Sequence, residues 1–246
     1  MKKLFLILAL IPLLGMGGGQ SVITGRHRIP AAAATGHSFS TGTVMQNCTL
    51  DSSDANKDCT ISSITSGDAV FVICNQNYGN TISVTSTPSA IALGVAHGNW
   101  QNIQAFVAVN ITGGSYTATI VHTQYSGGVQ CVFIPAGGVN NSTPFDVGAN
   151  GGAGLGTSMS TGSVTTTNAN DEVCSYWAPN YITSPTYTAG TGFTLVTSGT
   201  TNGAIAGYPG MQCKTAILTS TTTINPSLSW TPSGAVTAGT FAVMLQ

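Results

Sequence analysis

The densest group of charged side chains lies in a short polar segment between Cys48 and Cys59. Of the seven acidic residues in the protein, three fall in this segment, and one amide accompanies them: Asp51, Asp54, Asp58 and Asn56. Carboxylate and amide oxygens in one loop are the donors that calcium prefers. The spacing lacks the glycine turn and the closing glutamate of an EF-hand loop. We therefore interpret the segment as a hydrated loop, with calcium as the alternative and no other cofactor expected.

The six cysteines favour disulfides over a metal site. Cys48 and Cys59 flank the polar loop, and we predict that they pair, because a disulfide closing such a loop stabilises by about 3 kcal/mol. Neither a Cys-x-x-Cys nor a His-x-x-x-His spacing occurs, so zinc is not indicated. The other four cysteines lie in apolar or alternating segments, and their three connectivities stay open: Cys74, Cys131, Cys174 and Cys213.

Side chains suited to acid–base catalysis are few and scattered. Glu172 is the only glutamate, and its neighbour Asp171 points to the opposite face if both lie on one strand, so they cannot flank a glycosidic bond. A glycosidase would need one of them beside Asp68 or Asp146. We interpret the three aspartates instead as turn residues at strand ends. The nearest match to a nucleophile elbow, at residues 156–160, lacks the second glycine. Catalysis is therefore the least favoured class of function.

Aromatic rings in polar surroundings are the remaining candidates for ligand binding. A flat ring at a strand end or in a loop stacks on a sugar, while nearby amides and hydroxyls bond the sugar hydroxyls. The alternative is that Trp177 and Trp230 belong to the core and that the tyrosines fill loops. The residues that we predict to bind a neutral carbohydrate are Trp100, Tyr176, Trp177, Tyr181 and Tyr187.

The strand around which the fold is organised is predicted at residues 69–74. Ser66, Gly67 and Asp68 supply a turn, and an unbroken apolar run rich in β-branched and aromatic residues follows. The run is too short for a helix in a globular domain. We interpret it as a strand buried on both faces, so other strands must cover it from two sides.

Further short strands separated by turn signals follow along the chain, and no segment keeps a helical period. The glycine-rich segment 148–156 is interpreted as a long connection, because no helix follows it to cradle a phosphate. Many short strands predict an all-β fold, a two-layer antiparallel β-sandwich that is jelly-roll-like. The other predicted strands cover residues 81–85, 103–111, 116–122, 129–134, 163–167, 172–177, 193–197, 211–218, 227–231 and 241–245.

The chain begins with the pattern of a secretory signal peptide. Two lysines precede an apolar run over residues 4–14, and glycines follow. Pro12 and the glycines end this run before the roughly 20 apolar residues that a membrane span needs. We predict a signal peptide at residues 1–19, a flexible tether at 20–42 and a single β-sandwich domain at 43–246. The protein is expected to be secreted or held at the cell surface.

Charge is scarce throughout the chain. Charged residues make up 5% of it, against about a quarter in ordinary soluble domains, and the formal net charge is -1. So weak a field does not attract a polyanion, and nucleic acid is not expected as a partner. With 42% hydrophobic residues, disorder of the domain is not expected either. The shortage of lysine and glutamate leaves sheet edges without the charges that normally prevent pairing with another chain.

A set of turn and strand patterns spans most of the chain: Ser66-Gly67-Asp68 with its strand, Tyr125-Ser126-Gly127, residues 160–167 leading into Asn170-Asp171, and residues 187–194. In these patterns the sequence resembles a group of secreted bacterial β-sandwich proteins of unassigned function. The resemblance covers residues 65–246 and implies a β-sandwich. It supplies no catalytic residues, because the patterns are those of turns and strands.

These observations favour a secreted, non-enzymatic binding or surface domain whose partner is an extracellular glycan bound through exposed aromatic rings. The first alternative is a self-associating structural or adhesive extracellular subunit, since uncharged sheet edges pair readily. The second is a glycan-active hydrolase, which the missing acid–base pairs disfavour.

Overall fold

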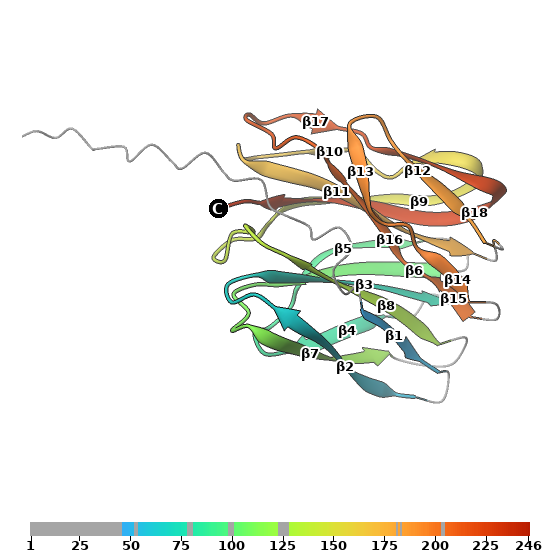
Figure 1. Ribbon diagram of the computed structural model, residues 1–246. Coiled ribbons are helices and arrows are strands. Elements are labelled where there is room, and N and C mark those ends of the chain that lie inside the picture. The colour runs from blue at the N-terminus through green and yellow to red at the C-terminus, as the bar shows by residue number, and fades with distance from the viewer. Residues whose placement is uncertain are drawn as a thin grey trace, which may run out of the picture. The chain divides into compact units, whose positions relative to one another are not determined.

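The computed structural model describes residues 46–51, 54–77, 81–97, 101–122, 128–180, 182, 184–202 and 205–246. The predicted signal peptide at 1–19 and tether at 20–42 lie outside these residues. Every regular element in the described ranges is a β-strand, and every strand pair is antiparallel, which confirms the all-β prediction (Figure 1). The same ranges hold no helix that is long and apolar enough to cross a membrane.

The strands form three larger sheets and two short pairs. The central sheet has the order β1-β8-β3-β6-β5, and the outer sheet has the order β2-β7-β4. The C-terminal sheet has the order β12-β18-β11-β16-β13, with β9 along the other side of β18, and the short pairs are β10-β17 and β14-β15. In chain order the strands are β1 (Gln46–Leu50), β2 (Asn56–Ile64), β3 (Ala69–Asn77), β4 (Ile82–Ser86), β5 (Ile91–His97), β6 (Gln101–Ala108), β7 (Gly114–His122), β8 (Val129–Ala136), β9 (Phe145–Ser160), β10 (Val164–Thr165), β11 (Asp171–Asn180), β12 (Thr186–Ala189), β13 (Phe193–Thr197), β14 (Thr200–Asn202), β15 (Ile205–Tyr208), β16 (Gly210–Lys214), β17 (Thr223–Ile224) and β18 (Ser227–Met244).

Strand β3 lies in the middle of the central sheet and is covered on both faces. Val70 and Val72 belong to a core shared with the outer sheet, which includes Ile61 of β2. Phe71 belongs to a second core shared with the C-terminal sheet, where its ring stacks on that of Phe241 of β18. The prediction that this strand is buried on both faces is therefore confirmed.

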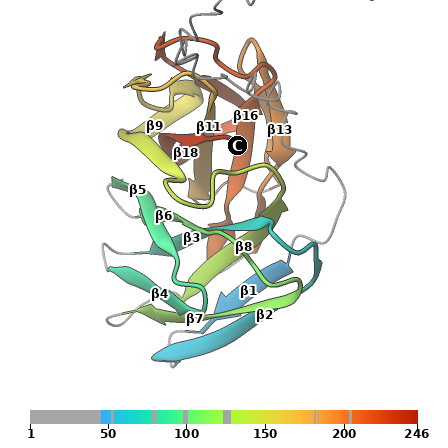
Figure 2. The same ribbon diagram turned by 90° about the vertical axis from the view of Figure 1, so that its left-hand side faces the viewer.

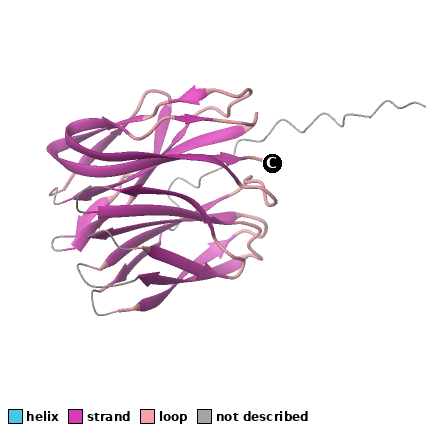
Figure 3. Cartoon of the chain, turned by 180° about the vertical axis from the view of Figure 1, so that it is seen from behind, coloured by secondary structure: helices cyan, strands magenta, loops and turns pink. Residues whose placement is uncertain are grey.

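The three sheets are stacked in the order outer, central and C-terminal (Figures 1 and 2). The prediction of a two-layer sandwich is therefore wrong, because a third sheet covers the second face of the central sheet. In a two-layer sandwich each sheet keeps one face toward solvent, so a strand that is apolar on both faces has no place in it. The view from behind shows the same arrangement of strands without helices (Figure 3).

All six cysteines pair, and none is free. The predicted bridge over the polar loop is present, which leaves two bridges that the sequence left open. Both of these join residues that lie directly opposite each other on neighbouring strands. Three disulfides are typical of a protein that folds in an oxidising compartment. The pairs and their Cα separations are Cys48–Cys59 at 6.0 Å, Cys74–Cys131 at 4.0 Å and Cys174–Cys213 at 4.1 Å.

Candidate functional site: two free sheet edges

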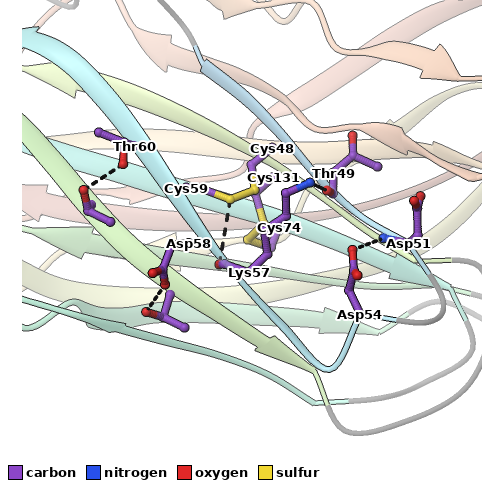
Figure 4. The surroundings of a disulfide bond; sticks show 12 residues. Cys48, Thr49, Asp51, Asp54, Lys57, Asp58, Cys59, Thr60, Cys74 and Cys131 are labelled. Carbon is purple, nitrogen blue, oxygen red and sulfur yellow. Dashed lines mark hydrogen bonds between the residues drawn. A yellow bond between two sulfur atoms is a disulfide. The ribbon is translucent and has the colours of Figure 1, made fainter.

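The predicted calcium ligands do not converge in the structure. Within the loop, the Asp51 backbone N–H donates to Oδ2 of Asp54 at 3.1 Å. Asp58 lies on β2 and accepts a hydrogen bond from the Thr119 hydroxyl of β7 at 2.5 Å, apart from the other two carboxylates (Figure 4). Asn56 begins β2 with an exposed side chain. The carboxylates therefore bond to different partners, and the four residues present no common set of oxygens.

One group of three metal-ligating side chains does occur among the described residues, at Glu172, Cys174 and Cys213. All three are buried, and the two sulfurs form a disulfide. A disulfide sulfur is a poor metal ligand, since metals bind the thiolate. In the oxidised protein this group is therefore a structural bridge.

The aromatic residues predicted to bind carbohydrate are not at the surface where the structure describes them. Tyr176, Trp177 and Tyr187 are buried, and the rings of Trp177 and Tyr187 contact each other at 5.3 Å between centroids. Trp100 and Tyr181 lie outside the described residues. The expectation that the first three are exposed is wrong, because β11 runs through the middle of the C-terminal sheet with both faces covered. Trp177 and Trp230 both belong to the core, which confirms the alternative interpretation.

Two sheet edges, by contrast, are open and lie next to each other. β5 is the last strand of the central sheet and pairs only with β6, while β9 pairs only with β18 among the described strands. Figure 2 shows β9 and β5 one above the other along one side of the stack. An edge strand carries a row of backbone N–H and C=O groups that a further strand can pair with. The two edges together form what we call the edge surface, made by β5 and β9.

The edge surface holds the exposed large apolar side chains of the described residues. Among the described residues these are four, and all of them lie on β5 or β9: Ile91 at 40% exposure, Val95 at 36%, Phe145 at 36% and Leu155 at 82%. The two strands contain no lysine, arginine or glutamate, and Asp146 is their only acidic residue. Natural edge strands usually carry charges that prevent pairing, and this surface lacks that protection.

A groove of about 320 Å³ runs between the two edges. Within the groove β9 approaches β5 very closely at one residue: a Cβ on Gly148 would lie 2.6 Å from the Leu93 carbonyl oxygen. Only glycine permits this approach. The residues that line the groove are Ala92, Leu93, Gly94, Val95, Phe145, Gly148, Ala149 and Asn150.

Sequence reasoning missed both strands of the edge surface. The glycine-rich segment 148–156 was expected to be a connection, but it is part of the long strand β9. Its glycines serve close contacts with other segments: a Cβ on Gly151 would lie 2.4 Å from the backbone of Thr161. Glycine lowers strand propensity because it adds backbone freedom without a side chain to pack, so the propensity signal pointed away from a strand.

Two aspartates that were interpreted as turn residues, Asp146 and Asp171, have shifted pKa values. Asp146, on β9, accepts hydrogen bonds from the Thr167 backbone N–H at 2.7 Å, from the Thr167 hydroxyl, and from Nδ2 of Asn168 at 3.0 Å. Asp171, the first residue of β11, is fully buried.

The pKa values of the two carboxyl groups are shifted in opposite directions. Burial, followed by the nearby carboxylate of Asp146, raises the pKa of Asp171 to about 7. Burial also acts to raise the pKa of Asp146, but the hydrogen bonds from Thr167 and Asn168, together with the nearby Asp171, outweigh it and hold that pKa below its usual value.

Comparison with protein-family models, with curated proteins and with solved structures gave no match. The resemblance to secreted bacterial β-sandwich proteins therefore stays a prediction, and the function is argued from the edge surface.

Proposed function

We propose that this protein is a self-associating structural subunit outside the cell, and that copies of it pair through the edge surface of β5 and β9. The observation that carries the proposal is the coincidence of three properties on one surface. The two strands are unpaired edges, they hold the four exposed large apolar side chains of the described residues, and they carry almost no charge. Each property alone is ordinary, but an exposed, uncharged, apolar edge is the kind that pairs with another chain.

A second copy is the partner that suits this surface best. The edge of one β9 supplies the antiparallel strand that the edge of another β9 needs, and a two-fold axis makes both contacts alike. Ile91, Val95 and Phe145 would then lose water contact together. Because Asp146 is the only acidic residue on the two strands and they hold no lysine or arginine, close approach carries little electrostatic penalty and depends little on salt.

Export and the jelly-roll arrangement are part of the same proposal. Three disulfides support folding in an oxidising compartment. The first eight strands have the orders β1-β8-β3-β6 and β2-β7-β4, and these orders favour a jelly roll in which β5 has joined the central sheet. The C-terminal sheet would then be an addition that covers the second face of the central sheet.

Carbohydrate binding through exposed aromatic rings has less support. Three of its five predicted residues are buried, and its remaining candidates, Trp100 and Tyr181, lie outside the described residues. A glycan would have to unpack the C-terminal sheet to stack on Tyr176 or Trp177.

Sedimentation equilibrium of the purified protein over a wide concentration range tests the proposal. We expect oligomers whose fraction rises with concentration, and a large loss of oligomer in the double variant Ile91→Lys, Val95→Lys, which places two charges on the edge of β5. The control is Thr85→Lys, which adds one charge to the exposed face of the outer sheet. A monomer at every concentration, or equal loss in the control, would overturn the proposal.

A further inference from the structure

We infer that Glu172, Cys174 and Cys213 form a zinc site when the bridge between the two cysteines is reduced. The metal ion and the disulfide are then alternatives at one place, and each joins β11 to β16. The inference is independent of the proposed function, since none of the three residues lies on β5 or β9.

The strand register brings the three side chains to one face of the C-terminal sheet. Glu172 and Cys174 are two residues apart on β11, so their side chains point to the same side. Cys213 of β16 lies directly opposite Cys174. One carboxylate oxygen of Glu172 and the two sulfur atoms accordingly lie within 4.8 Å of one another. Three donor atoms from two strands are thus gathered in the space that one ion and its ligands occupy.

The separations suit tetrahedral coordination. Zinc binds sulfur at about 2.3 Å and carboxylate oxygen at about 2.0 to 2.2 Å, so two sulfur ligands of one ion lie about 3.8 Å apart. The Cα atoms of Cys174 and Cys213 are 4.1 Å apart. Once the bond between the sulfurs is broken, rotation about each Cα–Cβ bond can bring them to the separation that zinc requires.

The donor set selects zinc over calcium. Two thiolates are soft ligands, which zinc accepts together with a carboxylate, whereas calcium requires oxygen ligands throughout. Three protein ligands leave the fourth tetrahedral position to water. Both cysteines belong to the apolar core shared with the central sheet, beside Phe241 and Val243. In these surroundings a divalent cation offsets the negative charge that two thiolates and a carboxylate would otherwise bury.

A dithiol reductant converts the bridge into the site. It donates two electrons and two protons to the sulfur–sulfur bond, which breaks to give two thiols, while the dithiol itself closes to a disulfide. Zinc then forms two bonds to sulfur and one to the Glu172 carboxylate, and the two thiol protons pass to water. Oxidation of the two thiolates restores the bridge and releases the ion.

Access to the sulfurs is through the strand β13. Cys213 lies opposite Thr194 of β13, and β13 is the end strand of the C-terminal sheet on this side (Figure 2). The register between β13 and β16 shifts between Leu195 and Thr197, so the ladder is interrupted close to Cys213. An interrupted ladder at a sheet edge has few hydrogen bonds to break, and such segments open first. A reductant or an ion therefore reaches Cys213 when β13 opens.

A second bridge in the same protein provides the matched comparison. Cys74 and Cys131 also lie directly opposite each other on antiparallel strands, are fully buried, and have Cα atoms 4.0 Å apart. Two residues before Cys74, at the place that Glu172 takes before Cys174, the chain has Val72. Within the described ranges, no carboxylate or histidine joins this bridge in a group of metal-ligating side chains. We therefore expect zinc at one reduced bridge and not at the other.

Protection of thiols by zinc tests the site. The protein is reduced with dithiothreitol, freed of reductant under argon, mixed with ZnCl2 and treated with N-ethylmaleimide, and mass spectrometry of its peptides gives the labelling rate of each cysteine. We expect zinc to slow the labelling of Cys174 and Cys213 by at least about tenfold, and that of Cys74 and Cys131 by less than about twofold.

Glu172→Gln separates a three-ligand site from binding by thiols alone. The variant keeps the size of the side chain and removes its charge, so protection of Cys174 and Cys213 should need at least about tenfold more zinc. Asp58→Asn, which removes an exposed carboxylate of the outer sheet, is the control and should behave like the natural protein.

Cobalt binding is a second measurement that does not depend on the folding of Glu172→Gln. The reduced natural protein should show the charge-transfer absorption of sulfur bound to Co2+, and the double variant Cys174→Ala, Cys213→Ala should not. Equal zinc protection of all four cysteines, no protection, or protection that is unchanged in Glu172→Gln would each overturn the inference. Cobalt absorption that persists in the double variant would overturn it as well.

Discussion

The ring of Phe71 on β3 stacks on the ring of Phe241 on β18, with 5.6 Å between their centroids. This contact joins the central sheet to the C-terminal sheet, and both side chains are fully buried. The pair therefore connects the middle strand of the central sheet to β18, the strand on which β9, β11 and β12 assemble.

Replacing Phe71 with alanine should therefore destabilise the fold strongly. We expect a loss of about 3 to 5 kcal/mol in the free energy of unfolding, since a large cavity would remain between two rigid sheets. Phe71→Leu, which keeps most of the volume, should lose clearly less. Urea unfolding followed by fluorescence measures both. A loss of under about 1 kcal/mol for the alanine variant would show that the two sheets do not depend on this contact.

Tyr176 offers a paired test of packing. Its hydroxyl is buried without a hydrogen-bond partner and lies where a Cβ on Gly94 would approach to 3.0 Å. We expect Tyr176→Phe to be neutral or slightly stabilising, because it removes an unsatisfied polar group. Gly94→Ala should be destabilising alone, by about 1 kcal/mol or more, and better tolerated when combined with Tyr176→Phe.

Gly148→Ala is the control for Gly94→Ala, because Tyr176→Phe should not restore its stability. The new Cβ would meet the Leu93 carbonyl oxygen, which belongs to the backbone and cannot be trimmed by substitution. We expect a loss of about 1 to 3 kcal/mol in the free energy of unfolding, whether or not Tyr176 is changed. Thermal unfolding of Tyr176→Phe, of the two glycine variants and of the two double variants provides the comparison. Equal rescue of both glycine variants by Tyr176→Phe would contradict the assignment of the contacts.

The disulfides should differ in their contributions to stability. In the chain-entropy model, the stabilisation grows with the length of the loop that the bridge closes. Replacing both cysteines of Cys74–Cys131, which are 57 residues apart, should cost about 4 kcal/mol. Replacing those of Cys48–Cys59, which are 11 apart, should cost about 3 kcal/mol. Guanidinium unfolding of the two double variants measures the difference, and the reverse order would count against this model.

The free energy of unfolding should decrease both above and below about pH 4, and the two decreases should have separate causes. The contribution of Asp171, whose pKa is raised to about 7, is complete below 3.8 and is lost as the pH rises to 7. The contribution of Asp146, whose pKa is lowered, is present above 3.8 and is lost as the pH falls further. Urea midpoints should therefore be highest near pH 4. Asp171→Asn should reduce the fall of the urea midpoint between about pH 4 and pH 7, and Asp146→Asn should reduce its fall below pH 4.

Leu155 tests whether the far end of β9 takes part in association. Its side chain is almost fully exposed, so Leu155→Ser should change the free energy of unfolding by less than about 0.5 kcal/mol. The same change should lower the oligomer fraction if the whole edge of β9 pairs with a second copy. Sedimentation of Leu155→Ser beside Thr85→Ser decides this, and equal oligomer fractions would confine the interface to the groove.

The composition and the apolar run at residues 69–74 predicted the fold class and the central strand correctly. Both signals depend on local chemistry, since β-branched residues behind a turn specify a strand whatever surrounds it. The number of layers was predicted wrongly. A run that is apolar on both faces shows that both faces are covered, but it does not show which strands cover them. The bridge between Cys48 and Cys59 could be predicted because the two residues are close in sequence. The pairing of Cys174 with Cys213 depends on strand register.

The candidate site lay beyond sequence reasoning for a related reason. Glycine in β9 was taken as a sign of a connection, although here it allows close approach of strands. Tyr176 and Trp177 were expected at a surface, but neighbouring residues on a strand point to opposite faces and here both faces are covered. The effect of Asp146 on the pKa of Asp171 also depends on tertiary structure, because the two residues lie on different strands, β9 and β11.

The position of β8 between β1 and β3 has a consequence for the way the chain folds. Neither of these early strands can complete its ladder until residues 129–136 have emerged and returned to lie between them. Contacts between distant segments form slowly, since the loop between them must close first. We therefore expect the central sheet to form only after β8 has paired with β1 and β3. The disulfide between Cys74 and Cys131, which joins β3 to β8, should form at the same step.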